Sequence, residues 1–114
     1  MNFKHIYKII DSNEWQIVKK KGLYSGSKKD IEDGYIHFSA QEQVVHTLNK
    51  YFKNKKNLIL LKINTLELEN LLWEQGSDGN MYPHLYSSLK VKCVVFESLI
   101  DTNNEGAHIL PLDF

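Results

Sequence analysis

The period of the apolar positions changes several times along the chain, which predicts a mixture of short strands and helices. Residues 3–10 alternate between apolar and polar side chains and are predicted to form a first strand. Residues 58–63 form a nearly continuous apolar run, which is typical of a central strand buried on both faces. Residues 91–99 are predicted to form the last long strand. Residues 109–112 favour an edge strand, because sheet edges tolerate proline.

Two segments combine helical spacing with helix-end signals. The first helix is predicted to follow Asp11, with Glu14 completing a capping pattern, and to end at Gly22. The second is predicted over 40–52, with Ser39 as its cap and Glu42 three residues later. The apolar positions expected to be buried are Trp15, Ile17 and Val18 in the first helix and Val44, Val45, Leu48, Tyr51 and Phe52 in the second.

Residues 23–34 are predicted to form a loop, in which Gly26-Ser27 can offer backbone N–H groups to an anion. The resulting pattern of about six strands and two main helices, in irregular order, favours the α+β class over a parallel α/β sheet.

The most informative stretch runs from Asp33 to Ser39. Asp33-Gly34 is a turn pair, and the following four residues are predicted to form a short strand. Alternation then places Ile36 and Phe38 toward the core, whereas Tyr35, His37 and Ser39 share the other face. That face carries a phenol, an imidazole and a hydroxyl, which suits a ligand. A second interpretation of Ser39 is purely structural, because a helix cap explains its hydroxyl.

Two further segments carry candidate chemistry, Trp73-Glu74 and the run from Pro83 to Tyr86. A histidine and a carboxylate can together perform acid–base catalysis or hold a ligand. Each residue also has an ordinary alternative, namely a core tryptophan, a solvated glutamate and a loop histidine. A metal site built from His37, Glu74 and His84 is a further alternative, which their lack of short ligand spacing disfavours.

Composition narrows the function classes. The 114 residues favour one domain over 1–114, and 14 basic residues balance 14 acidic ones, so bulk charge gives no sign of nucleic-acid binding. The single cysteine, Cys93, cannot form an intramolecular disulfide and is expected to be a small buried side chain. The sequence lacks a recognisable signal peptide or membrane span, so we expect a soluble, cytoplasmic protein.

Motifs spread over most of the chain resemble the DUF952 family. They occur in the family's order: Ile6-Tyr7-Lys8-Ile9, Tyr24-x-Gly26-Ser27-x-x-Asp30, Asp33-Gly34-Tyr35-Ile36-His37-Phe38-Ser39 with Gln43, Trp73-Glu74, and Pro83-His84-Leu85-Tyr86. The resemblance implies an ADP-ribosyltransferase-like fold, in which two small, split antiparallel sheets surround a cleft. The family's own activity is undefined, and a fold does not establish chemistry.

The resemblance also selects residues for the cleft. By analogy with transferases of this fold, Glu74 and His37 become the candidate catalytic residues, Glu74 to polarise a ribose hydroxyl and His37 to hold the ribose. The candidate ligand-binding residues are Ser27, Ser39, Trp73, His84 and Tyr86. His5, His46 and His108 fall outside the motifs and are not expected in the cleft.

The expected ligand is a nucleotide-like or other anionic small molecule, with NAD or ADP-ribose as candidates and NAD as a substrate. No resident cofactor or metal is predicted. A glycosyl (ADP-ribosyl) transferase or NAD glycohydrolase, a non-catalytic binding module, and an accessory protein that binds a polypeptide through the aromatic rim all remain open.

Overall fold

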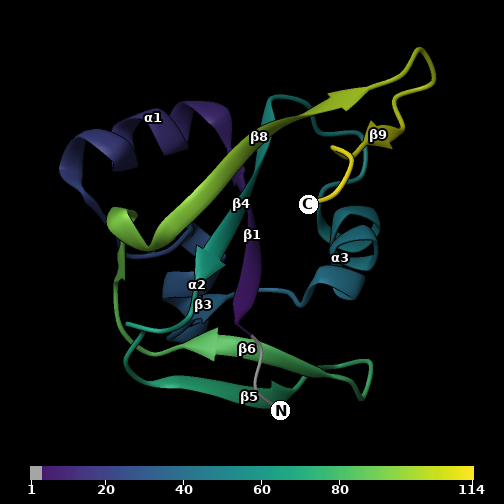
Figure 1. Ribbon diagram of the computed structural model, residues 1–114. Coiled ribbons are helices and arrows are strands. Elements are labelled where there is room, and N and C mark those ends of the chain that lie inside the picture. The colour runs from purple at the N-terminus through teal and green to yellow at the C-terminus, as the bar shows by residue number, and fades with distance from the viewer. Residues whose placement is uncertain (1–3) are drawn as a thin grey trace.

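The computed structural model describes residues 4–114, which form antiparallel strands in three sets with helices around them (Figure 1). Phe3, which the predicted first strand included, lies outside the described residues. The strands are β1 (His5–Asp11), β2 (Leu23–Tyr24), β3 (Ile36–His37), β4 (Leu58–Asn64), β5 (Leu71–Gln75), β6 (Met81–Leu85), β7 (Leu89–Lys90), β8 (Val94–Thr102) and β9 (His108–Ile109). The helices are α1 (Ser12–Lys21), α2 (Lys28–Asp33) and α3 (Val44–Tyr51), with single 3₁₀ turns η1 (Gln41–Gln43) and η2 (Val91–Cys93).

The largest sheet has the order β1-β4-β8-β9 and separates two cores. Helix α1 lies on one face and α3 on the other (Figure 1). Successive side chains of β4 point to opposite faces, so Leu61 packs in the α1 core whereas Leu60 packs in the α3 core. Both are completely buried. The prediction of a central strand buried on both faces is therefore confirmed.

A smaller sheet, of order β3-β6-β5, and the pair β2-β7 complete the fold. The chain leaving β3 runs beside β1, where Tyr7 and Ser39 exchange backbone hydrogen bonds of 2.8 and 2.9 Å. This bridge attaches the small sheet to the edge of the large one. The predicted α+β class with antiparallel pairing is confirmed. The two predicted sheets are in fact three hydrogen-bonded sets, because β2 and β7 pair separately.

The ends of α1 follow the sequence signals. The Asp11 carboxylate accepts a 3.1 Å hydrogen bond from the Glu14 N–H, and Gly22 ends the helix at a φ of 78°. Trp15 and Val18 are buried as predicted, but Ile17 is 57% exposed because it falls on the outer side of the helix.

The start of α3 differs from the prediction. Its first turn is the 3₁₀ turn η1, and the cap is formed by the Gln43 side chain, which accepts a 2.9 Å hydrogen bond from the Ala40 N–H. The Ser39 hydroxyl instead lies 2.8 Å from the Thr47 hydroxyl, so the predicted Ser39–Glu42 capping box is wrong. Along α3, Val44 and Leu48 are buried, whereas Val45 and Tyr51 lie largely exposed.

Three other predictions change. The predicted loop over 23–34 contains β2 and α2, a helix of six residues that is too short to show a period. The predicted strand over 91–99 begins only at Val94, after η2, and the edge strand β9 precedes the proline instead of containing it. Cys93 is buried, as expected. Within residues 4–114, no helix is long and apolar enough to cross a membrane.

Candidate functional site

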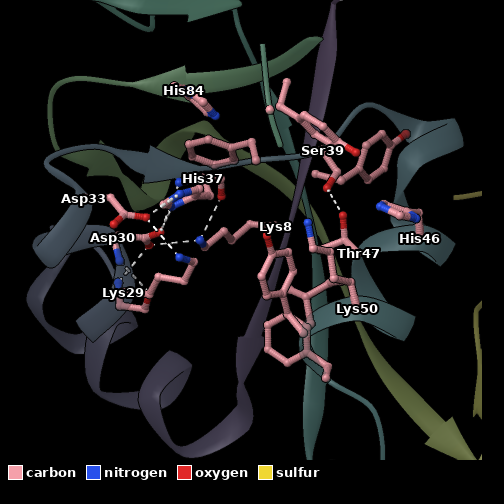
Figure 2. Close-up of a pocket in the computed structure, with 18 of the residues that line it drawn as sticks. Lys8, Lys29, Asp30, Asp33, His37, Ser39, His46, Thr47, Lys50 and His84 are labelled. Atoms are coloured by element: carbon pink, nitrogen blue, oxygen red, sulfur yellow. Dashed lines mark hydrogen bonds and ion pairs between the residues drawn. The ribbon is translucent and has the colours of Figure 1, made fainter. Parts of the chain in front are cut away.

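A cavity of about 560 Å³ opens between the small sheet, α2, α3 and the edge strand β1. Its walls come from sequence segments that lie far apart. The α2 segment contributes Asp30 and Asp33, the small sheet contributes His37 and His84, and α3 contributes Lys50. Figure 2 shows the α2 group on one side of the cavity and Ser39, His46, Thr47 and Lys50 on the other. We call this cavity the cleft.

The deepest charged group of the cleft is the Asp30 carboxylate, which is only 2% exposed. Its Oδ2 accepts hydrogen bonds of 2.9 Å from Lys8 Nζ and 2.8 Å from the Ser27 N–H. The Ser27 hydroxyl accepts in turn from the Asp30 N–H, so Ser27 and Asp30 form the capping box that starts α2. A single local motif therefore both begins the helix and fixes a buried carboxylate.

Glycine is required just before this motif. Gly26 has a φ of 113°, and a Cβ added there would lie 2.7 Å from the Asp30 Cβ. The Ser27 N–H that the sequence offered to an external anion is thus already used by an internal one.

His37 lies between two carboxylates. Its Nδ1 is 2.6 Å from Asp30 Oδ1, and its Nε2 is 3.0 Å from Asp33 Oδ2. The His37 N–H also donates to Asp30 Oδ1, at 3.1 Å, and the His37 carbonyl accepts from Lys8 Nζ, at 2.8 Å. The backbone and one ring nitrogen of His37 are therefore fixed by buried groups.

His84 is paired with a different carboxylate, that of Glu74. It is the register partner of His37 in the small sheet, and the two ring centroids lie 5.5 Å apart. His84 Nδ1 is 2.9 Å from Glu74 Oε1, and the Tyr86 hydroxyl donates to the same oxygen at 2.6 Å. The predicted meeting of His37 and His84 in one cleft is confirmed, and each imidazole has a carboxylate of its own.

The Tyr35 ring covers this histidine pair. It stacks on His84 with a centroid distance of 4.1 Å and an interplanar angle of 21°. It also contacts the His37 ring at 4.7 Å and the Tyr86 ring at 5.2 Å. As alternation predicted, Tyr35, His37 and Ser39 all line the cleft, and Ile36 and Phe38 are buried in the α1 core. Phe38, although buried, also contributes to the lining of the cleft.

The local contacts shift several pKa values. Burial would raise the pKa of Asp30, but the bond to His37, the charge of Lys8 and the Ser27 N–H together hold it well below its ordinary value. Burial lowers the pKa of Lys8, against the opposing effect of Asp30. The Tyr86 hydroxyl and the His84 ring lower the pKa of Glu74. The same contact with Glu74 raises the pKa of Tyr86 to about 12.

The far end of the cleft is closed by the turn between β5 and β6. Lys50 Nζ donates to the Ser77 hydroxyl at 2.8 Å, and His46 Nε2 lies 3.4 Å from Asp78 Oδ2. The Tyr82 hydroxyl donates to the same Asp78 oxygen at 2.5 Å and lowers the pKa of Asp78 to about 2. His46, which the sequence placed outside the cleft, therefore lines it.

The candidate residues fall into two groups. Ser27, His37, Ser39 and His84 line the cleft, while Glu74 and Tyr86 lie at its border and reach it through His84 and Tyr35. Trp73 does not join them. It is opposite Pro83 in the register, its side chain points to the face of the sheet opposite that of Glu74, and it packs against the α1 core. Its side chain is not among those that line the cleft.

Sequence reasoning did not select four residues that line the cleft, namely Lys8, Lys29, Asp30 and Lys50. A usable signal existed for Asp30, because Ser27-x-x-Asp30 follows the spacing of a capping box. For Lys8, the alternation predicted over residues 3–10 gave no reason to expect its ammonium group in the cleft. For the part of the chain from residue 4 onward, no group of three or more His, Cys, Asp or Glu side chains is arranged to hold a metal ion.

Comparison with known proteins places the chain in a family. Protein CC0527 from Caulobacter crescentus is 40% identical, and its crystal structure superposes with a TM-score of 0.86 over 92% of this chain and 93% of that chain. Its solution NMR structure gives a TM-score of 0.80 over 91% and 90% of the two chains. A search of curated proteins finds no match. The profile of the protein family of unknown function DUF952 matches residues 9–96, so the chain belongs to this family.

Proposed function

We propose that this member of the DUF952 family binds a nucleotide-like, phosphorylated small molecule in its cleft, with NAD and ADP-ribose as the leading candidates. The observation that carries the proposal is the convergence of His37 and His84, each paired with a carboxylate, beneath the Tyr35 ring and next to the lysines of α2 and α3. Antiparallel sheets on either side of a cleft also support an ADP-ribosyltransferase-like arrangement.

The composition of the cleft suits such a ligand. Exposed aromatic faces stack on a base or a nicotinamide ring, and the Tyr35 and Tyr51 rings both border the cavity. Ammonium groups pair with phosphates, and Lys28, Lys29, Lys50 and Lys55 line the same cavity. The volume of about 560 Å³ falls within the range of roughly 300–1,000 Å³ found for small-molecule sites.

If the bound molecule reacts, the chemistry proposed is glycosyl transfer or hydrolysis at the nicotinamide ribose. The C1′–N bond breaks and its electrons go to nicotinamide, water or another acceptor adds to C1′, and one proton is released. The transition state carries positive charge on the ribose, which a nearby carboxylate stabilises. Glu74 would supply that carboxylate and polarise the 2′-hydroxyl from the border of the cleft, with Oε2 as the interacting atom because the bonds from His84 and Tyr86 both end on Oε1. His37 would hold the ribose.

The test separates an enzyme from a binding module. Glu74→Gln keeps the shape of the side chain but removes its charge, so the affinity for NAD and ADP-ribose should stay nearly unchanged while nicotinamide release is abolished. Calorimetry measures binding, and chromatography measures nicotinamide. Glu69→Gln, at an exposed position outside the cleft, is the matched control and should alter neither property.

Clear binding without turnover in the parent protein would favour the non-catalytic module. If neither NAD nor ADP-ribose nor a related nucleotide binds, the proposal is wrong.

A further inference from the structure

Two donors in the cleft converge on one oxygen atom. His37 Nε2 lies 3.0 Å and Lys29 Nζ 3.1 Å from the same Oδ2 of Asp33. Figure 2 shows Lys29, Asp33 and His37 gathered on the α2 side of the cavity. An oxygen held by an imidazole and an ammonium group is the arrangement in which proteins hold one oxygen of a phosphate.

The two carboxylates beside His37 are held very differently. Asp30 is 2% exposed and is fixed by Lys8, by the Ser27 N–H and by the His37 backbone. Asp33 is 34% exposed and is the last residue of α2, followed by Gly34 at a φ of 88°. A side chain at such a position can turn out into water at little cost, since the two ion pairs that hold it are partly exposed. The Nδ1 side of His37 is therefore permanent, and the Nε2 side is exchangeable.

A further cation, Lys50, lines the same cleft. Lys29 Nζ is 5.8 Å and Lys50 Nζ is 5.1 Å from the centroid of the same Tyr51 ring, and both side chains line the cleft. Lys29 comes from α2 and Lys50 from α3, so ammonium groups from both walls of the cleft approach the same ring. A phosphoryl group has several oxygens and can bind several donors at once, which favours it over a single carboxylate.

We propose that His37 Nε2 and Lys29 Nζ form a phosphoryl-binding subsite, and that Asp33 occupies this subsite as an internal competitor when the cleft is empty. The ligand's phosphoryl oxygen displaces the Asp33 carboxylate, which moves into solvent. The inference rests on the proposed function in one respect, namely that the cleft takes a phosphorylated molecule. It gives the exchangeable Nε2 of His37 to the phosphoryl group instead of the ribose, and it explains why the empty protein holds that place closed.

The test is that removing the competitor and removing a donor should change the affinity for phosphate in opposite directions. Inorganic phosphate and pyrophosphate are the probes, in NMR titrations at low ionic strength. Asp33→Asn removes the competitor and should tighten phosphate binding about two- to fivefold. This factor corresponds to the small free energy that a partly exposed ion pair contributes. Glu32→Gln, an exposed neighbour on the same helix, removes the same charge and should change the affinity much less. His37→Gln and Lys29→Gln should weaken binding, whereas Lys20→Gln on α1 should not.

Side-chain nitrogen spectra of the unmodified protein give a second measurement that does not depend on the folding of any variant. Phosphate should shift the His37 Nε2 resonance and leave Nδ1, which stays bonded to Asp30, nearly unchanged. The inference is overturned if Asp33→Asn behaves like Glu32→Gln, or if phosphate leaves both His37 nitrogens unmoved. Binding of NAD or ADP-ribose with no dependence on Asp33 would refute the subsite and leave the proposed function intact. If phosphate shifts the His37 Nε2 resonance but no nucleotide binds, the proposed function is refuted and the phosphoryl-binding subsite is retained.

Discussion

Asp30→Asn should destabilise this fold far more than a typical surface substitution. The change leaves the Lys8 ammonium, 9% exposed, without a counter-ion in the interior. Breaking a buried ion pair by removing one partner costs about 3–5 kcal/mol. An amide also has a single acceptor oxygen, whereas donors now reach both oxygens of Asp30, from His37 on one side and from Lys8 and Ser27 on the other. At least one donor must then face the amide's NH₂ group.

The expected loss of about 3–5 kcal/mol is a large part of the roughly 5–15 kcal/mol that stabilises a typical domain. Urea unfolding, followed by the fluorescence of Trp15 and Trp73, measures it as a lower midpoint at unchanged slope. Asp33→Asn is the matched control, because Asp33 is partly exposed and its ion pairs should contribute no more than about 1 kcal/mol.

The double variant Lys8→Met/Asp30→Asn tests the origin of the effect. Removing both charges relieves the unpaired cation, so the double variant should lose less stability than the sum of the two single variants. If Asp30→Asn costs no more than Asp33→Asn, or if the two single effects simply add, the buried pair does not stabilise the structure as argued.

Two other outcomes follow from the same contacts. Ser39→Ala should cost about 1 kcal/mol through loss of the buried Thr47 hydrogen bond, and Ser39→Ala/Thr47→Val should cost less than the two single changes together, whereas a capping role would make them independent. The pKa of Asp30 is lower in the fold than in the unfolded chain, so its ionised form stabilises the fold above about pH 4, and that contribution is lost as the pH falls toward the depressed value. Urea titrations in acid should therefore show a steep loss of stability in the parent protein and a shallower one in Asp30→Asn.

Local patterns in the sequence were sufficient wherever the deciding interactions lie within a few residues. The first helix begins at Asp11 and ends at Gly22 because a cap and a left-handed glycine act on their immediate neighbours. The run over 58–63, apolar except for Lys62, predicted a buried strand from its own composition, since a short strand covered on both faces buries apolar residues at successive positions. Strand alternation also placed His37 on the side opposite Ile36 and Phe38.

The tertiary structure decided which polar groups meet. The Lys8–Asp30 pair joins residues 22 positions apart, and no local period indicates that a lysine in an alternating strand faces the interior. Strand register brings His84 opposite His37 and turns Trp73 toward the core while its neighbour Glu74 meets His84. Ser39 is a further example. The sequence allowed it to cap the following helix, but in the fold its backbone pairs with Tyr7 of β1 and its hydroxyl lies against that of Thr47. Chain neighbours determine helix ends and strand faces, whereas the chemistry of the cleft depends on contacts that exist only after the sheets have packed.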